Sequence, residues 1–71
     1  MIKMIDLLNA WGNDDVFVIR TKDMTVRATK SVLLSEKICK GLVHMTAFNV
    51  IVRQSEDGED IVYVHAEEEA A

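Results

Sequence analysis

Residues 46–68 read TAFNVIVRQSEDGEDIVYVHAEE, and this segment carries the strongest structural signal in the chain. Apolar β-branched and aromatic residues dominate both halves, and Asp57-Gly58 lies between them. An Asp-Gly dipeptide between two alternating segments is among the strongest signals of a β-hairpin, so the sequence predicts a hairpin with a two-residue turn. That turn pairs Val52 with Tyr63, Val50 with His65 and Phe48 with Glu67 on one face, and Ile51 with Val64 and Arg53 with Val62 on the other.

A second hairpin is predicted by the preceding stretch, VFVIRTKDMTVRATK, residues 16–30. It is rich in β-branched and aromatic residues and is interrupted at Lys22-Asp23, the expected turn. The register is favoured because it sorts apolar from polar side chains, and a slip of one residue would invert that pattern. The expected pairs are Thr21 with Met24, Ile19 with Val26 and Phe17 with Ala28 on one face, and Val18 with Arg27 and Arg20 with Thr25 on the other.

Two helices are expected beside the hairpins. The segment MIKMIDLLNAWG, residues 1–12, has apolar residues three and four positions apart, followed by Gly12 as a C-cap able to adopt the left-handed conformation. Its apolar stripe consists of Met1, Met4, Ile5, Leu8 and Trp11. The segment TKSVLLSEKICKG, residues 29–41, predicts a second helix with Ser31 as N-cap and Gly41 at its end, and a start at Ser35 is the alternative.

These elements predict an α+β fold, a four-stranded antiparallel sheet from two hairpins with two helices, in the order αββαββ. Residues 1–66 would form a single α+β domain, and residues 67–71 an acidic C-terminal tail. A chain this short buries only about 60% of the surface of its unfolded form, and two helices can cover one sheet face only. We therefore expect a homodimer that buries Ile51, Val62 or Val64.

The sequence contains no pattern typical of a catalytic or metal centre. Cys39, His44 and His65 lack the short spacings of zinc ligands, and the three glycines form no phosphate-binding loop. We expect no enzyme activity, no metal and no cofactor, and we interpret Cys39 and His65 as structural residues. No apolar run approaches the roughly 18 residues of a membrane span, so a cytoplasmic location is expected.

Charge is separated along the chain. Residues 1–53 carry all eight Lys and Arg residues against five Asp and Glu, hence +3, whereas residues 54–71 carry seven acids and no base, hence −7. One hypothesis uses the basic part: Arg20, Lys22, Arg27 and Lys30 on the first hairpin would contact the phosphates of a nucleic acid. A pI near 4.9 opposes general attraction to a polyanion, so this is the alternative.

The other hypothesis uses the acidic part. Glu56, Asp57, Glu59 and Asp60 lie at the tip of the last hairpin, and Glu67, Glu68 and Glu69 lie at its far end. With six strand residues at about 3.3 Å each, the two groups would be roughly 20 Å apart. Spaced carboxylates on a rigid sheet can imitate rows of phosphates.

The segments SEDGED and AEEEAA, together with NDD at residues 13–15, give this small chain an acidic pattern that resembles the DNA-mimic proteins of bacteriophages, some of which are decoys for the histone-like nucleoid protein HU. The resemblance implies an inhibitor that occupies the DNA-binding surface of a basic partner protein, in the host cytoplasm if the chain is encoded by a phage. It implies a partner-binding site at Asp14, Asp15, Glu56, Asp57, Glu59, Asp60, Glu67, Glu68 and Glu69.

Overall fold

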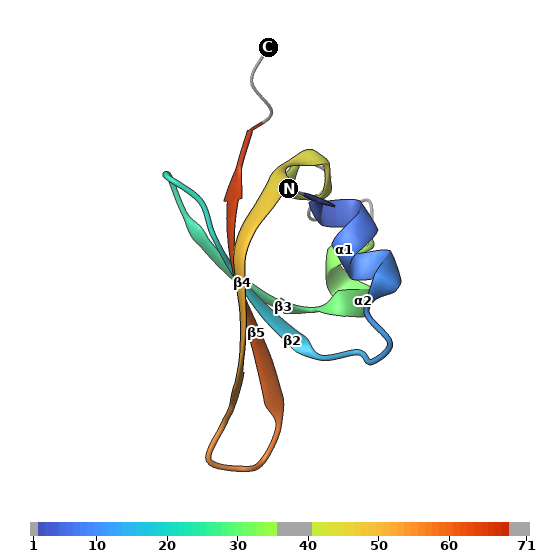
Figure 1. Cartoon of the computed structure of the whole chain (residues 1–71), viewed down its shortest axis with the longest axis vertical. Helices are drawn as coiled ribbons and strands as arrows, with labels where there is room; N and C mark the ends of the chain where they lie inside the picture. The colour runs from blue at the N-terminus through green and yellow to red at the C-terminus, as the bar shows by residue number, and fades with distance from the viewer. Residues whose placement is uncertain (1, 36–40, 69–71) are drawn as a thin grey trace.

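The computed structural model of the chain describes residues 2–35 and 41–68. It confirms a small α+β fold, in which one five-stranded sheet is covered on one side by the helices (Figure 1). The elements in chain order are β1 (Ile2–Lys3), α1 (Met4–Ala10), β2 (Val16–Arg20), β3 (Thr25–Thr29), α2 (Lys30–Leu33), the 3-10 helix η1 (Leu42–His44), β4 (Thr46–Gln54) and β5 (Asp60–Glu67).

The sheet is mixed, with the strand order β1-β4-β5-β2-β3. The expectation of four antiparallel strands in the order αββαββ is therefore wrong: β1 is an additional strand, and β2 pairs with β5 in parallel. The two strands that pair in parallel, β2 and β5, supply most of the buried sheet residues: Phe17, Ile19, Val62, Val64 and Ala66. The core consists of Met4, Leu8, Phe17, Ile19, Leu33, Leu42, Ala47, Val62, Val64 and Ala66.

The first hairpin has the predicted register. All predicted strand pairs are present, from Phe17 opposite Ala28 to Arg20 opposite Thr25. The Thr21 amide donates to the Met24 carbonyl at 2.8 Å, and this bond closes the turn at Lys22-Asp23.

The predicted register of the second hairpin is wrong, because Asp57-Gly58 is not a two-residue turn. The Gly58 amide donates to the Ser55 carbonyl at 3.0 Å, the Ser55 amide donates to the Glu59 carbonyl at 2.7 Å, and Gly58 has a φ of 81°. These bonds define a three-residue loop with glycine in the left-handed position. The corrected pairs are Val52 with Val62, Ile51 with Tyr63 and Arg53 with Ile61.

A bulge shifts the register again farther along β4. Asn49 has a φ of 50°, and the pairing changes between Phe48 and Ile51, so that Phe48 lies opposite His65 rather than Glu67. Asn49 and Val50 together oppose one residue of β5, which is the definition of a bulge. Asparagine is one of the few residues other than glycine that adopts this conformation at small cost.

Helix α1 buries Met4 and Leu8 of its predicted stripe. It begins at Met4 rather than Met1, because Ile2 and Lys3 pair with β4 as strand β1. The predicted Gly12 C-cap is also wrong: Trp11 takes the C-cap position in an extended conformation, and Gly12 does not have a positive φ.

Helix α2 starts before the predicted N-cap. Thr29 is its N-cap and accepts a hydrogen bond from the Val32 amide, whereas Ser31 lies within the helix. The helix ends at Leu33, with Leu34 as its C-cap, so one continuous helix over residues 29–41 is wrong. Residues 36–40, which include Cys39 and most of the alternative helix from Ser35, lie outside the described residues. In the described part of the chain, no helix is long and apolar enough to cross a membrane.

Candidate protein-binding surface

Carboxylates from two segments of the chain, residues 14–15 and 56–60, gather at one end of the sheet. Because β2 and β5 are parallel, both strands begin at this end, with Val16 opposite Ile61. Asp14 and Asp15 precede β2, while Glu59 and Asp60 lie where β5 begins, and all four line one shallow hollow. Glu56 and Asp57 lie in the loop between β4 and β5. We call the whole group the acidic tip: Asp14, Asp15, Glu56, Asp57, Glu59 and Asp60.

Two of these carboxylates also accept hydrogen bonds from other segments of the fold. Asp14 accepts hydrogen bonds from the amide of Ser31 at 2.7 Å and from its hydroxyl at 2.9 Å. The bond from the Ser31 amide lowers the pKa of Asp14, as do the hydroxyl bond and the charge of Lys30, so Asp14 stays ionised at neutral pH. Asp15 accepts a hydrogen bond from the indole nitrogen of Trp11 at 2.8 Å.

The described basic side chains form no close ion pair with the acidic tip, although the charge of Lys30 acts on Asp14. Within residues 2–35 and 41–68, the only contact within 4 Å between a basic and an acidic side chain joins His65 and Glu67, at 3.3 Å. No carboxylate of the acidic tip therefore has a Lys or Arg partner at that distance in the described part of the chain. Glu56, Asp57 and Glu59 are exposed to solvent. These charges are available to a basic surface of another molecule.

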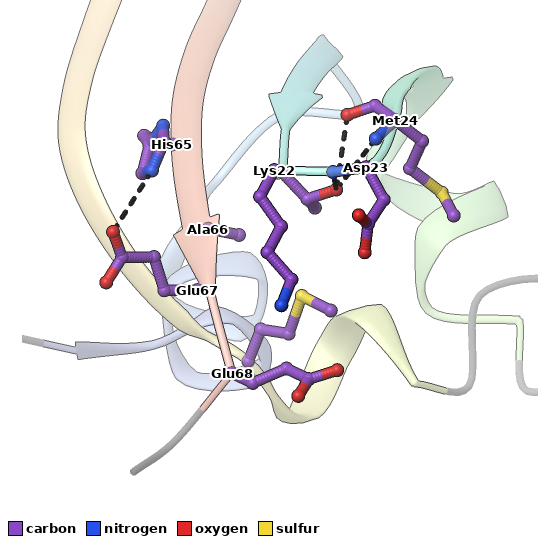
Figure 2. A pocket seen from close by; sticks show the side chains of 9 residues that line it. Lys22, Asp23, Met24, His65, Ala66, Glu67 and Glu68 are labelled. Atoms are coloured by element: carbon purple, nitrogen blue, oxygen red, sulfur yellow. Dashed lines mark hydrogen bonds and ion pairs between the residues drawn. The ribbon is translucent and has the colours of Figure 1, made fainter.

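The other predicted acids lie at the opposite end of β5, in a different environment. Strand β5 continues through Glu67, one residue into the expected tail, and Glu69 lies outside the described residues. Figure 2 shows the Glu67 carboxylate turned toward His65, and Lys22 lines the same hollow as Glu68. The structure therefore does not bring Glu67 and Glu68 together with the acidic tip. These two glutamates line a hollow that Lys22 also lines.

A third surface is the face of the sheet opposite the helices, which we call the open sheet face (Figure 1). The registers place three arginines on it, one each from β2, β3 and β4, and three aromatic side chains from β4 and β5. These residues are Arg20, Arg27, Arg53, Phe48, Tyr63 and His65. Val18, Arg20, Thr25, Asn49 and Tyr63 help to line a shallow hollow of about 430 Å³ there.

The open sheet face changes the alternative hypothesis about the first hairpin. Only Arg20 and Arg27 of its four basic residues lie on this face. Lys22 lies in the turn, and the Lys30 ammonium donates to the Trp11 carbonyl. Arg53 was missed, because the predicted register put it opposite Val62, a core residue. The sequence signal for the correct loop was Gly58, because a glycine at the third position after Ser55 is typical of a three-residue hairpin loop.

Comparison with protein-family models, with curated proteins and with solved structures finds no match to this chain. The described residues contain no group of three or more His, Cys, Asp or Glu side chains placed to hold a metal ion. Two charged surfaces, the acidic tip and the open sheet face, are therefore the candidate binding surfaces of the chain.

Proposed function

We propose that this chain is a protein-binding module that inhibits a basic DNA-binding protein, of the HU nucleoid type, by occupying its DNA-binding surface as a DNA mimic. The observation that carries the proposal is the acidic tip, where six carboxylates from two segments lie at one end of the sheet without a Lys or Arg ion-pair partner within 4 Å in the described residues. Lysines and arginines that normally contact phosphates would contact these carboxylates instead.

The structure of the tip suits this role in two ways. Asp14 and Asp15 are held by hydrogen bonds from Ser31 and Trp11, so their charges are fixed in place before a partner arrives. A pre-ordered group loses less conformational entropy on binding than a mobile one. Clustered charge of one sign also accelerates encounter with a surface of opposite sign.

The test is a gel-shift assay with labelled duplex DNA and a purified HU protein. The chain should release DNA from the HU complex and should not shift the DNA by itself. Replacing two exposed tip acids, Glu56→Gln with Glu59→Gln, should weaken the release. The matched control, Asp6→Asn with Asp23→Asn, changes the net charge equally at exposed positions away from the tip and should release DNA like the natural sequence.

Either of two results would contradict the proposal: failure of the natural chain to release DNA, or equal loss of release in the two double variants. Equal loss would mean that net charge matters and that the position of the tip does not. Circular dichroism of each variant confirms that the fold is retained.

A second candidate function, direct binding of nucleic acid, is favoured by one observation. Arg20, Arg27 and Arg53 share the open sheet face with Tyr63 and Phe48. Aromatic side chains on a sheet can stack on unpaired bases while arginines contact the phosphates. A gel shift of single-stranded DNA or RNA by the chain alone, abolished by Arg20→Ala with Arg27→Ala, would support this function and not the DNA mimic.

A further inference from the structure

Strand β4 has an outer edge that is free over most of its length. On one side β4 pairs with β5, but on the other side β1 pairs only with Thr46 and Ala47. Beyond the bulge at Asn49, residues Val50–Gln54 have no neighbouring strand on that side among the described residues. Figure 1 shows this part of β4 running past the helices toward the loop.

The side chains of this free edge are unusually apolar. Val50, Ile51 and Val52 are 40%, 48% and 48% exposed, respectively. Ile51 lies on the open sheet face opposite Tyr63, and Val52 lies on the face of Val62. The two faces of the edge are therefore both apolar. An exposed, β-branched edge strand is a template for pairing with another strand.

We infer that the outer edge of β4 pairs with the same edge of a second copy of this chain, forming a homodimer with one continuous sheet. The register follows from the loop. The Ser55 amide donates to the Glu59 carbonyl and the Ser55 carbonyl accepts from the Gly58 amide, so both peptide groups of Ser55 point toward β5, as do those of Arg53 two residues earlier. Those of Val52 and Gln54 consequently point outward, toward the free edge.

The middle residue of the free segment Val50–Gln54 is Val52. Antiparallel pairing about a twofold axis at Val52 uses the whole segment and places Val52 opposite the partner's Val52. Ile51 then lies opposite the partner's Arg53, whose aliphatic stem can cover it, and Val50 lies opposite the partner's Gln54. No two like charges lie directly opposite each other, so the edge is complementary to itself.

The buried core limits which residues can form the dimer interface. Val62 and Val64 are 0% and 3% exposed within one chain, so the expectation that they form the dimer interface is wrong, and only Ile51 of the three residues named for it is available. The pairing does not depend on the proposed function. It would, however, place two acidic tips on one rigid sheet, at opposite ends of the paired strands.

The experiment is sedimentation velocity of the full chain over a range of concentrations. The natural sequence should sediment as a species of about twice the 8.0 kDa of one chain. Val52→Lys should convert it to the single-chain mass with an unchanged circular dichroism spectrum. Met24→Lys is the matched control, since Met24 is 58% exposed in the turn of the other hairpin, and this variant should remain dimeric.

A cross-link tests the register. In a Cys39→Ser background, Val52→Cys should form a disulfide-linked dimer on mild oxidation, because opposed residues of paired strands lie within the Cα separation that a disulfide spans. Arg27→Cys, on the edge strand β3, should not. A natural chain that stays monomeric at high concentration, or a dimer that survives Val52→Lys, would overturn the inference.

Discussion

Asp14 shows how a single residue can serve both the fold and the proposed contact surface. Its two hydrogen bonds from Ser31 connect the loop before β2 to the first turn of α2. The same carboxylate belongs to the acidic tip and keeps its charge because the Ser31 amide stabilises the ionised form. Removing Asp14 would therefore change stability and binding together. Glu56 and Glu59 are better positions for testing binding alone.

The lowered pKa of Asp14 predicts how acid affects stability. A carboxyl group whose native pKa lies below its ordinary value of 3.8 stabilises the fold above that value, and the contribution is lost as the pH falls through the native pKa. Asp14→Ala should therefore lower the free energy of unfolding at neutral pH and have less effect in strong acid. Urea unfolding at both pH values measures this, with Asp23→Ala as the exposed control. An equal loss at both pH values would contradict the argument.

Gly58 is predicted to matter more than its neighbour Asp57. Only Gly58 of this pair has a positive φ, so the left-handed conformation constrains Gly58 and not Asp57. Gly58→Ala should cost about 1–2 kcal/mol, the price of the left-handed conformation for a residue with a Cβ atom. For a domain of this size, each kcal/mol lowers the melting temperature by about 4–8 °C. Asp57→Ala and Gly12→Ala should melt close to the natural chain, and a large drop for Asp57→Ala would contradict the loop geometry.

At the scale of elements, the two hairpins differ in how well the sequence specifies their register. In the first hairpin the polar residues Arg20 and Arg27 fall on one face, so a slipped register would bury charge, and the prediction was correct. In the second hairpin both faces are apolar around Val50–Val52. A register shifted by one residue would therefore bury no charge there, and the alternation of apolar and polar residues does not distinguish the two registers. The loop Ser55–Glu59 and the bulge at Asn49 decide the register instead.

Contacts between distant segments could not be predicted from local pattern. The apolar spacing of residues 1–12 correctly indicated a helix, but only the pairing with Ala47 makes Ile2 and Lys3 a strand. Ser31 has a good N-cap side chain, yet its amide and hydroxyl are used by Asp14, which is distant in sequence. The loop acids of the tip were visible in SEDGED, whereas their proximity to Asp14 and Asp15 follows from the parallel pairing of β2 with β5.

The bulge in β4 gives a prediction at this scale. Asn49 has a φ of 50°, which a β-branched residue adopts only at a cost of about 1–3 kcal/mol. Asn49→Val should lower the free energy of urea unfolding by that amount, and Asn49→Gly should be close to neutral. Gln54→Val, in the regular part of the same strand, is the control for added β-branched bulk. A harmless Asn49→Val would show that the strand can lose its bulge.

At the scale of the whole molecule, the acidic tip and the arginines of the open sheet face form a strongly polar charge distribution in a chain with a net charge of only −4. If the tip contacts a basic partner, the interaction is screened by salt over about 8–10 Å at physiological ionic strength. Affinity should therefore fall steeply as salt increases. Long-range charge mainly speeds encounter, so loss of a tip acid should act on the association rate.

The corresponding prediction compares the two groups of acids in binding kinetics with an HU protein. Glu56→Gln with Glu59→Gln should slow association more than it speeds dissociation, and should flatten the dependence on salt. Glu67→Gln with Glu68→Gln should have a smaller effect, because Lys22 and His65 lie near that end. Surface plasmon resonance at low and moderate salt distinguishes the two. A larger effect of the second pair would move the contact to the far end of β5.

The parallel pairing of β2 with β5 also sets the order in which the chain can fold. Each hairpin joins residues close in sequence and can form in about 1–10 μs, but Val16 meets Ile61 only after most of the chain between them has been brought together. Such distant contacts slow folding, because the entropy of closing a long loop is lost before the contact forms. A substitution where β2 pairs with β5, such as Val62→Ala, should therefore reduce the folding rate more than Thr25→Ala in the edge strand β3. Stopped-flow refolding of the two variants measures whether the docking of the two hairpins is the slow step.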